Sequence, residues 1–150
     1  MTTMDASSAR MNSGLVVRMA RSGEVDSISP LLAEAYIEFR PHFPEDAWHR
    51  YLGEIVDVRG RSADSVLIVA ESEGALAGTV CFYPDASLSS LERWPVGWAS
   101  IRTVAVVGSL RRKGIGEALG RECVRRARAQ GARAVGLHSA SFMTAATRLY

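Results

Sequence analysis

Apolar residues follow two different periods along this chain, and these periods predict alternating strands and helices. Short apolar runs predict strands at residues 15–19, 65–71, 76–83, 98–107 and 133–139. Apolar positions three and four residues apart predict helices at 24–39, 45–59, 116–130 and 141–150. The predicted element order is therefore β-α-α-β-β-β-α-β-α.

Glycine and proline refine the ends of these elements. Pro30 predicts either a kink in the first helix or a helix that begins there, with Ser29 as its N-cap. The turn at 72–74 predicts a β-hairpin, and Gly131 predicts the end of the third helix.

The connections between strands indicate the fold class. A hairpin pairs two strands antiparallel, whereas the helix at 116–130 connects two strands that we expect to be parallel. We predict an α/β (α+β) protein with a mixed, mostly antiparallel sheet flanked by helices. One domain covers 14–150, and residues 1–13 are predicted to be a disordered leader.

The third helix has one apolar and one charged face. The apolar positions predicted to pack on the sheet are Ile115, Ala118, Leu119, Cys123, Val124 and Ala127. The charged positions predicted to face solvent are Glu117, Arg121, Arg125 and Arg128.

Composition excludes some classes of partner. The 150 residues are 47% hydrophobic and 23% charged, and the net charge of +2 gives no argument for nucleic-acid or membrane binding. No run is long and apolar enough to cross a bilayer. Cys81 and Cys123 lack metal-type spacing, so we predict reduced core thiols in a cytoplasmic protein.

The chemistry of the chain is concentrated in the motif Arg111-Arg112-Lys113-Gly114-Ile115-Gly116, between a predicted strand and a predicted helix. Unpaired N–H groups at a helix N-terminus bind anions, and glycine lets the backbone approach the ligand closely. The motif therefore predicts a diphosphate-binding turn. A nucleoside-triphosphate site of the P-loop type is excluded, because no Gly-Lys-Ser/Thr follows.

With this motif, the chain resembles the GCN5-related N-acetyltransferase (GNAT) superfamily over residues 15–150. The motif is similar to the family's Gln/Arg-x-x-Gly-x-Gly/Ala signature, and 146–150 is similar to a family segment that ends in Leu-Tyr. The resemblance implies the acyl-CoA N-acyltransferase fold, acetyl-CoA as cosubstrate and no metal. The implied cofactor-binding residues are Val104, Ala105, Val106, Arg111, Arg112, Lys113, Gly114, Ile115 and Gly116.

The resemblance also assigns roles within the site. Backbone N–H groups of 112–116 hold the diphosphate with Arg111 as counter-charge, and Val104 to Val106 line the pantetheine. Tyr150 is the expected proton donor to the thiolate. The arginines of the third helix are predicted to be solvated rather than to contact the 3′-phosphate.

The sequence leaves the base and the acceptor pocket open. Glu34, Glu71 and Glu92 are candidate bases, although a solvated carboxylate is favoured for each, and a water relay or a neutral amine needs none of them. The three histidines form no metal set. The aromatic residues either bind an acceptor or close the core: Tyr36, Phe39, Trp48 and Trp94.

The family continues into two further strands that are absent after Tyr150. We expect a tail not represented here; a covering partner chain and an incomplete enzyme are the alternatives. The predicted function is acetyl transfer from acetyl-CoA to a primary amine of a small molecule or peptide, by direct attack. The alternative is a non-catalytic acyl-CoA-binding module. No nucleic-acid or membrane partner is expected, and a homodimer is left open.

Overall fold

The computed structural model describes residues 8–11, 14–89 and 94–137. The strands are β1 (Ser8–Met11), β2 (Leu15–Met19), β3 (Val66–Ser72), β4 (Ala75–Tyr83), β5 (Trp98–Val106) and β6 (Ala134–Gly136). The α-helices are α1 (Val25–Tyr36), α2 (Glu45–Val56), α3 (Val58–Arg61) and α4 (Ile115–Ala129). The 3₁₀ turns are η1 (Ser22–Glu24), η2 (Ile37–His42), η3 (Ala86–Leu88) and η4 (Gly108–Leu110).

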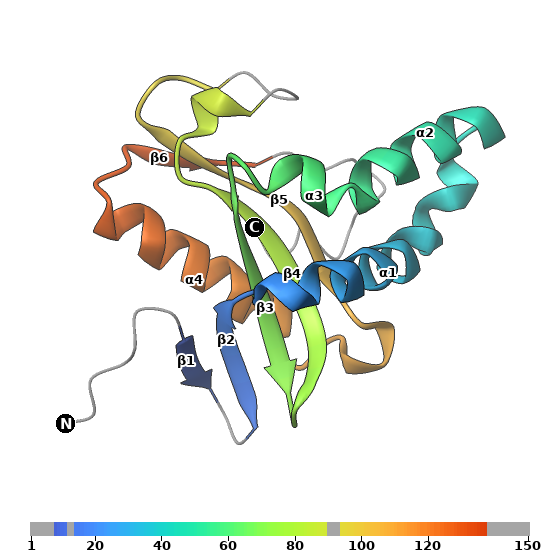
Figure 1. The fold of residues 1–150 in the computed structure, drawn as a ribbon, viewed down its shortest axis with the longest axis horizontal. Coiled ribbons are helices and arrows are strands. Elements are labelled where there is room, and N and C mark those ends of the chain that lie inside the picture. Colours follow the sequence, from blue (N-terminus) through green and yellow to red (C-terminus); the bar gives the residue numbers. More distant parts are fainter. Residues whose placement is uncertain (1–7, 12–13, 90–93, 138–150) are drawn as a thin grey trace.

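The strands form one sheet in the order β1-β2-β3-β4-β5-β6 (Figure 1). Neighbours from β1 to β5 are antiparallel, and β5 and β6 are parallel because α4 connects them. The mixed, mostly antiparallel sheet predicted from the sequence is therefore confirmed. The helix predicted at 141–150 lies outside the described residues.

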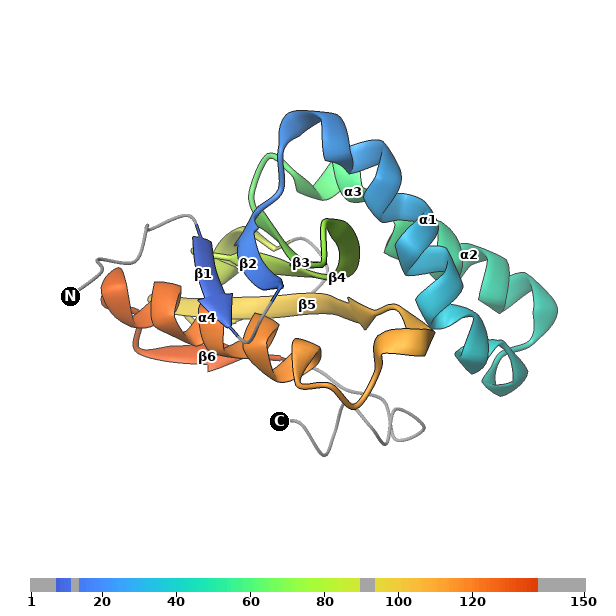
Figure 2. The ribbon, with the colours of Figure 1, turned by 90° about the horizontal axis from the view of Figure 1, so that it is seen from below.

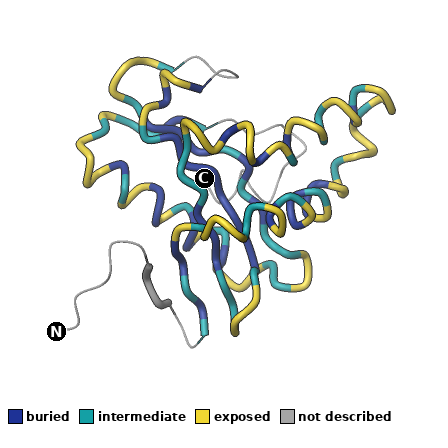
Figure 3. The backbone as a smooth tube through the Cα atoms, viewed as in Figure 1, coloured by how far each residue is buried: buried dark blue, intermediate teal, exposed yellow. Residues whose placement is uncertain are grey.

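Helices cover both faces of the sheet. Helices α1, α2 and α3 lie on one face and α4 lies on the other (Figure 2). The central strands are buried, whereas the outer sides of α2 and α4 are exposed (Figure 3). Each face thus contributes its own hydrophobic cluster, and the sheet separates the two.

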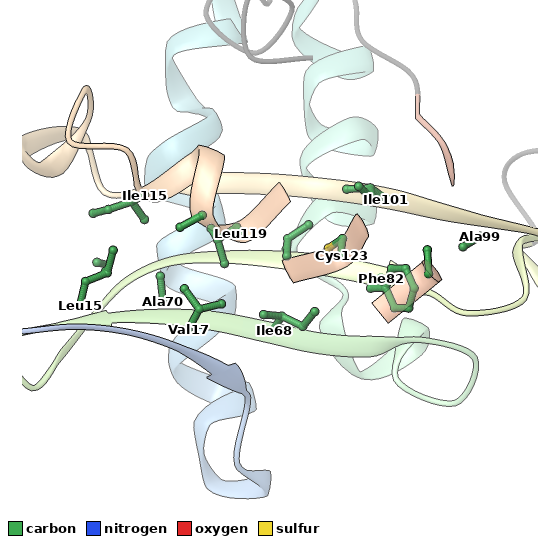
Figure 4. Packing of buried hydrophobic residues seen from close by; sticks show 14 residues of the cluster. Leu15, Val17, Ile68, Ala70, Phe82, Ala99, Ile101, Ile115, Leu119 and Cys123 are labelled. Atoms are coloured by element: carbon green, nitrogen blue, oxygen red, sulfur yellow. The ribbon is translucent and has the colours of Figure 1, made fainter. Parts of the chain in front are cut away.

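Helix α4 packs with the apolar face that the sequence predicts (Figure 4). Leu119 and Cys123 are fully buried against the sheet. One position differs from the prediction, because Val124 is 37% exposed. Glu122, which the sequence assigns to neither face, is buried. Glu122 tolerates burial because Arg125 and Arg126 donate to its carboxylate at 2.6 and 3.0 Å.

One predicted boundary is corrected, and one of the two alternatives at Pro30 is ruled out. Ser8–Met11 lies within the predicted leader but forms β1, which pairs with β2 across a turn where Gly14 has φ 86°. Helix α1 begins at Val25 and continues through Pro30, so Ser29 is not its N-cap. The Ser29 hydroxyl instead donates to the Val56 carbonyl of α2 at 2.8 Å. Burial of α1 against the sheet outweighs the cost of an internal proline.

Gly78 of β4 gives the first prediction. A Cβ built there lies 2.8 Å from the Ala105 carbonyl oxygen and 3.1 Å from Leu119 Cδ1. Gly78→Ala forces apart β5 and the start of α4, so we expect a loss of about 1–3 kcal/mol in unfolding free energy. Urea unfolding of wild type and variant measures this loss of unfolding free energy.

The matched control is Gly53→Ala in α2, where nothing lies within 4 Å of the added Cβ. This variant should gain about 1 kcal/mol from helix propensity. An unchanged midpoint for Gly78→Ala would show that β5 and α4 adjust without cost.

An ion pair at the start of α1 gives a pH prediction. Arg18 donates to both oxygens of Glu24, at 2.7 and 2.8 Å, and these bonds lower the pKa of Glu24 from 4.5 to about 2. The folded-state pKa is depressed, so this stabilisation is complete above pH 4.5 and is lost as the pH falls towards 2. Wild type should lose more stability between pH 6 and pH 3 than Glu24→Gln in chemical denaturation. Equal losses would contradict this assignment.

Candidate functional site

The site is built around the part of β5 that β6 does not cover. Trp98 to Ser100 pair with Ala134 to Gly136 of β6, whereas Ser100 to Val106 pair with β4. Within the described ranges, residues 103–106 pair with no residue of β6, although the Val104 and Val106 carbonyls accept side-chain bonds from Tyr36 and Arg111. This part of β5 is therefore a strand edge that no neighbouring strand covers, in the middle of the molecule.

A bulge interrupts β5 in this open stretch. Thr79 pairs with Ala105 and Cys81 pairs with Arg102, so Thr103 and Val104 both face the single residue Val80. Thr103 has φ 52°, which is unfavourable for a β-branched residue. Strain of this kind persists where the surroundings enforce it, and it is frequent at functional sites. No signal in the sequence predicts this bulge.

The turn after β5 exposes several backbone N–H groups. Arg112 and Gly114 are both left-handed, with φ 64° and 81°. Gly114 is the N-cap of α4 and makes no side-chain cap bond. In the described part of the chain, no hydrogen bond is found from the N–H groups of Arg112, Lys113 and Gly114. Together with the first-turn N–H groups of α4, they form an anion-binding concavity at the positive end of the helix dipole.

The Arg111 side chain points to α1 rather than out of this concavity. Its Nη2 donates to the Ala35 carbonyl at 3.1 Å, and its Nη1 lies 2.5 Å from the Glu38 carboxylate. Its Nε donates to the Val106 carbonyl at 3.4 Å. The sequence correctly locates Arg111 in the turn, but it carries no signal for these partners.

A pocket of about 620 Å³ lies between α4 and the strands β5 and β6. This volume is in the range of small-molecule sites. Its lining joins the first turn of α4, the bulge and the open edge: Ile101, Val104, Gly116, Glu117, Gly120, Arg121, Val124, Arg125, Arg128, Val135 and Leu137.

Two arginines of this lining are neutralised by glutamates of the same helix. Arg121 lies 2.5 Å from Glu117, and Arg125 lies 2.6 Å from Glu122. Both side chains are largely exposed, as the sequence predicts for a solvated face.

An aromatic cluster lies on the other face of the sheet, where α1, η2 and α2 meet. Phe43 stacks on Tyr51 at 4.7 Å, and Tyr36 lies 5.6 Å from Phe39. Trp48 is 1% exposed and belongs to the core. Burial raises the pKa of Tyr51. The side chains of Phe39, Phe43 and Tyr51 are half-buried. These three residues form a partly exposed surface beside the core, which is called the aromatic wall below.

Tyr36 connects this cluster to the bulge. Its hydroxyl donates to the Val104 carbonyl at 3.3 Å, and the residue is 8% exposed. Trp94 does not belong to this cluster: it stacks on Trp98 at 5.6 Å, over Gly136 of β6. The four aromatic candidates thus separate into two groups.

The remaining predicted residues are distributed as follows. Glu71 accepts from Arg18 at 3.1 Å, and Glu34, His42 and His49 are exposed. Glu92, His138 and Tyr150 lie outside the described residues. Among the described His, Cys, Asp and Glu side chains, no group of three or more could hold a metal ion. No helix of the described chain has both the length and the apolar character needed to cross a membrane.

Comparison with known proteins identifies the family. Residues 25–150 match the acetyltransferase (GNAT) family. The chain belongs to this family. The predicted GNAT fold and the predicted enzyme class, an N-acetyltransferase, are confirmed.

Solved structures agree with this assignment. A GNAT acetyltransferase from Brucella melitensis in complex with acetyl-CoA is 26% identical, with a TM-score of 0.59 over 87% of this chain and 80% of that one. An aminoglycoside acetyltransferase from an uncultured soil metagenomic sample is 23% identical, with a TM-score of 0.60 over 91% and 88%.

A transcriptional regulator from Bacillus halodurans C-125 is 22% identical, with a TM-score of 0.64 over 91% of this chain and 89% of that one. The similarity of these last two structures supports the fold alone. A search of curated proteins finds no match to this GNAT chain.

Proposed function

We propose that this GNAT enzyme transfers the acetyl group of acetyl-CoA to a primary amine by direct attack. The observation that carries the proposal is the uncapped, left-handed turn that joins the open edge of β5 to the N-terminus of α4. A diphosphate needs several N–H donors at one point, and an extended chain of amides needs a free strand edge. Coenzyme A contains both groups.

The diphosphate binds to the N–H groups of Arg112 to Gly116. The helix dipole and the exposed side chains of Arg112 and Lys113 add positive charge there. Left-handed backbone at two positions supports this assignment, because alternating conformations turn successive N–H groups towards one point.

The pantetheine runs along Val104 to Val106, a stretch of β5 that β6 does not pair with in the described chain. A strand N–H near Val106 polarises the thioester carbonyl and stabilises the oxyanion that develops on it. The bulge at Thr103 and Val104 supports this placement, because it re-aims the backbone of β5 at this point.

The acceptor amine approaches from the face covered by α1, η2 and α2, beside the aromatic wall. The neutral amine attacks the thioester carbon, the C–N bond forms, and the C–S bond of the tetrahedral intermediate breaks. The amine loses a proton to water or a base, and the departing thiolate takes a proton from Tyr150. Direct attack is supported by the cysteines: Cys123 is fully buried, and burial raises its pKa to about 12.

Gly114→Ala tests the diphosphate turn. Alanine is strained at φ 81°, by about 1–2 kcal/mol, and its relaxation turns the N–H groups away from their common point. We expect acetyl-CoA to bind about tenfold more weakly, which corresponds to roughly 1.4 kcal/mol. Isothermal titration with acetyl-CoA measures the change.

Gly108→Ala is the control, because nothing lies within 4 Å of the added Cβ in the same connection. If the Gly114→Ala protein is folded and binds acetyl-CoA with wild-type affinity, the diphosphate binds elsewhere.

Tyr150→Phe tests the proton donor. The variant keeps the ring and loses only the hydroxyl, so acetyl-CoA affinity should be unchanged while kcat falls by about 10- to 100-fold. Thiol release over a panel of primary amines measures turnover. Unchanged kcat would exclude this role for Tyr150, and tight acetyl-CoA binding without turnover by wild type would indicate a binding module instead.

A further inference from the structure

We infer that Arg111 is a positioning residue that holds the diphosphate turn and the open edge of β5 against the C-terminal end of α1. This inference rests on the proposed function, and it replaces the role of counter-charge to the diphosphate. The guanidinium and its partners Ala35, Glu38 and Val106, together with the bond from Tyr36 to Val104, are called the α1 clamp below.

The geometry of the guanidinium supports a bridging role. Its three nitrogens contact three separate segments: the last turn of α1 at Ala35, η2 at Glu38, and the end of β5 at Val106. A planar fork with fixed donor directions can hold three partners, whereas an ammonium group is a single point charge. The surface ion pair alone contributes little, since Glu38 is about half exposed, so the carbonyl bonds carry most of the effect.

The end of α1 carries the partial negative charge of the helix dipole. Helix α1 has no basic residue in its last turn, where the chain continues into η2. Arg111 donates to the Ala35 carbonyl from 76 residues away in the sequence. It therefore supplies the positive charge that stabilises a helix C-terminus.

A second contact joins the same turn of α1 to the bulge. Tyr36 follows Ala35, and its buried hydroxyl donates to the carbonyl of Val104. Consecutive residues of α1 thus contact both parts of the proposed donor site, the bulge through Tyr36 and the turn through Arg111. Because α1 and η2 also form the aromatic wall, the α1 clamp sets the distance between the thioester and the acceptor.

The two roles of Arg111 differ for a donor that lacks phosphate. S-acetylpantetheine keeps the thioester and the amide chain but has no diphosphate. A counter-charge to the diphosphate contributes nothing to the reaction of S-acetylpantetheine. A positioning residue contributes equally to the reactions of both donors. Lysine at 111 keeps the charge but cannot bridge three segments.

The experiment compares kcat/KM of Arg111→Lys with acetyl-CoA and with S-acetylpantetheine, using an amine that wild type acetylates. We expect a loss of about tenfold with both donors and a raised KM for the amine, because misplacement of reacting groups lowers the rate. Loss of folded protein alone would lower kcat and leave both KM values unchanged. Near-wild-type activity with acetyl-CoA, or a loss confined to acetyl-CoA, would overturn the inference.

Two further variants complete the test. Tyr36→Phe removes the hydroxyl bond of the α1 clamp to the Val104 carbonyl and should lower kcat/KM with S-acetylpantetheine several-fold; no change with this donor would count against the inference. Lys113→Met is the matched comparison. Removal of this exposed charge should lower kcat/KM with acetyl-CoA and leave kcat/KM with S-acetylpantetheine unchanged. If wild type neither binds acetyl-CoA nor acetylates any amine, the proposed function fails, which is a separate outcome.

Discussion

The unequal pairing of β5 is the constraint on which the rest of the structure depends. Strand β4 pairs with residues 100–106 of β5, whereas β6 pairs with only 98–100. The parallel β6 must follow a helix, and α4 returns it to the far end of β5. Helix α4 begins shortly after the open edge of β5, so the turn at 111–114 directly follows this edge in the chain.

Close packing on both faces maintains this arrangement. Gly78 lets α4 and β5 approach β4 more closely than a side chain would allow. On the opposite face, α1 is buried against the sheet and reaches the bulge through Tyr36. The strained backbone at Thr103 is thus held between two packed layers, so the bulge and the open strand edge are formed before any ligand arrives.

Several features could be predicted from the sequence because they depend on local patterns. The period of apolar residues identified α4 and its buried face, and the glycines identified the turn before it and the end after it. Other features depend on residues far apart in the chain. Pro30 left open a kink or a helix start, and packing of α1 on the sheet maintains the helix across it.

The sequence alone determined the main strands and helices between residues 15 and 137, their hydrophobic faces and the family, because period, turn residues and the Arg111-to-Gly116 motif are all local. Tertiary structure decided where the Arg111 guanidinium points, which strand carries the bulge and which aromatic residues gather beside it. The physical reason is the range of the interactions. A helical period depends on neighbours three and four residues away, whereas Arg111 contacts a carbonyl 76 residues earlier, which only the packing of α1 on the sheet brings within reach.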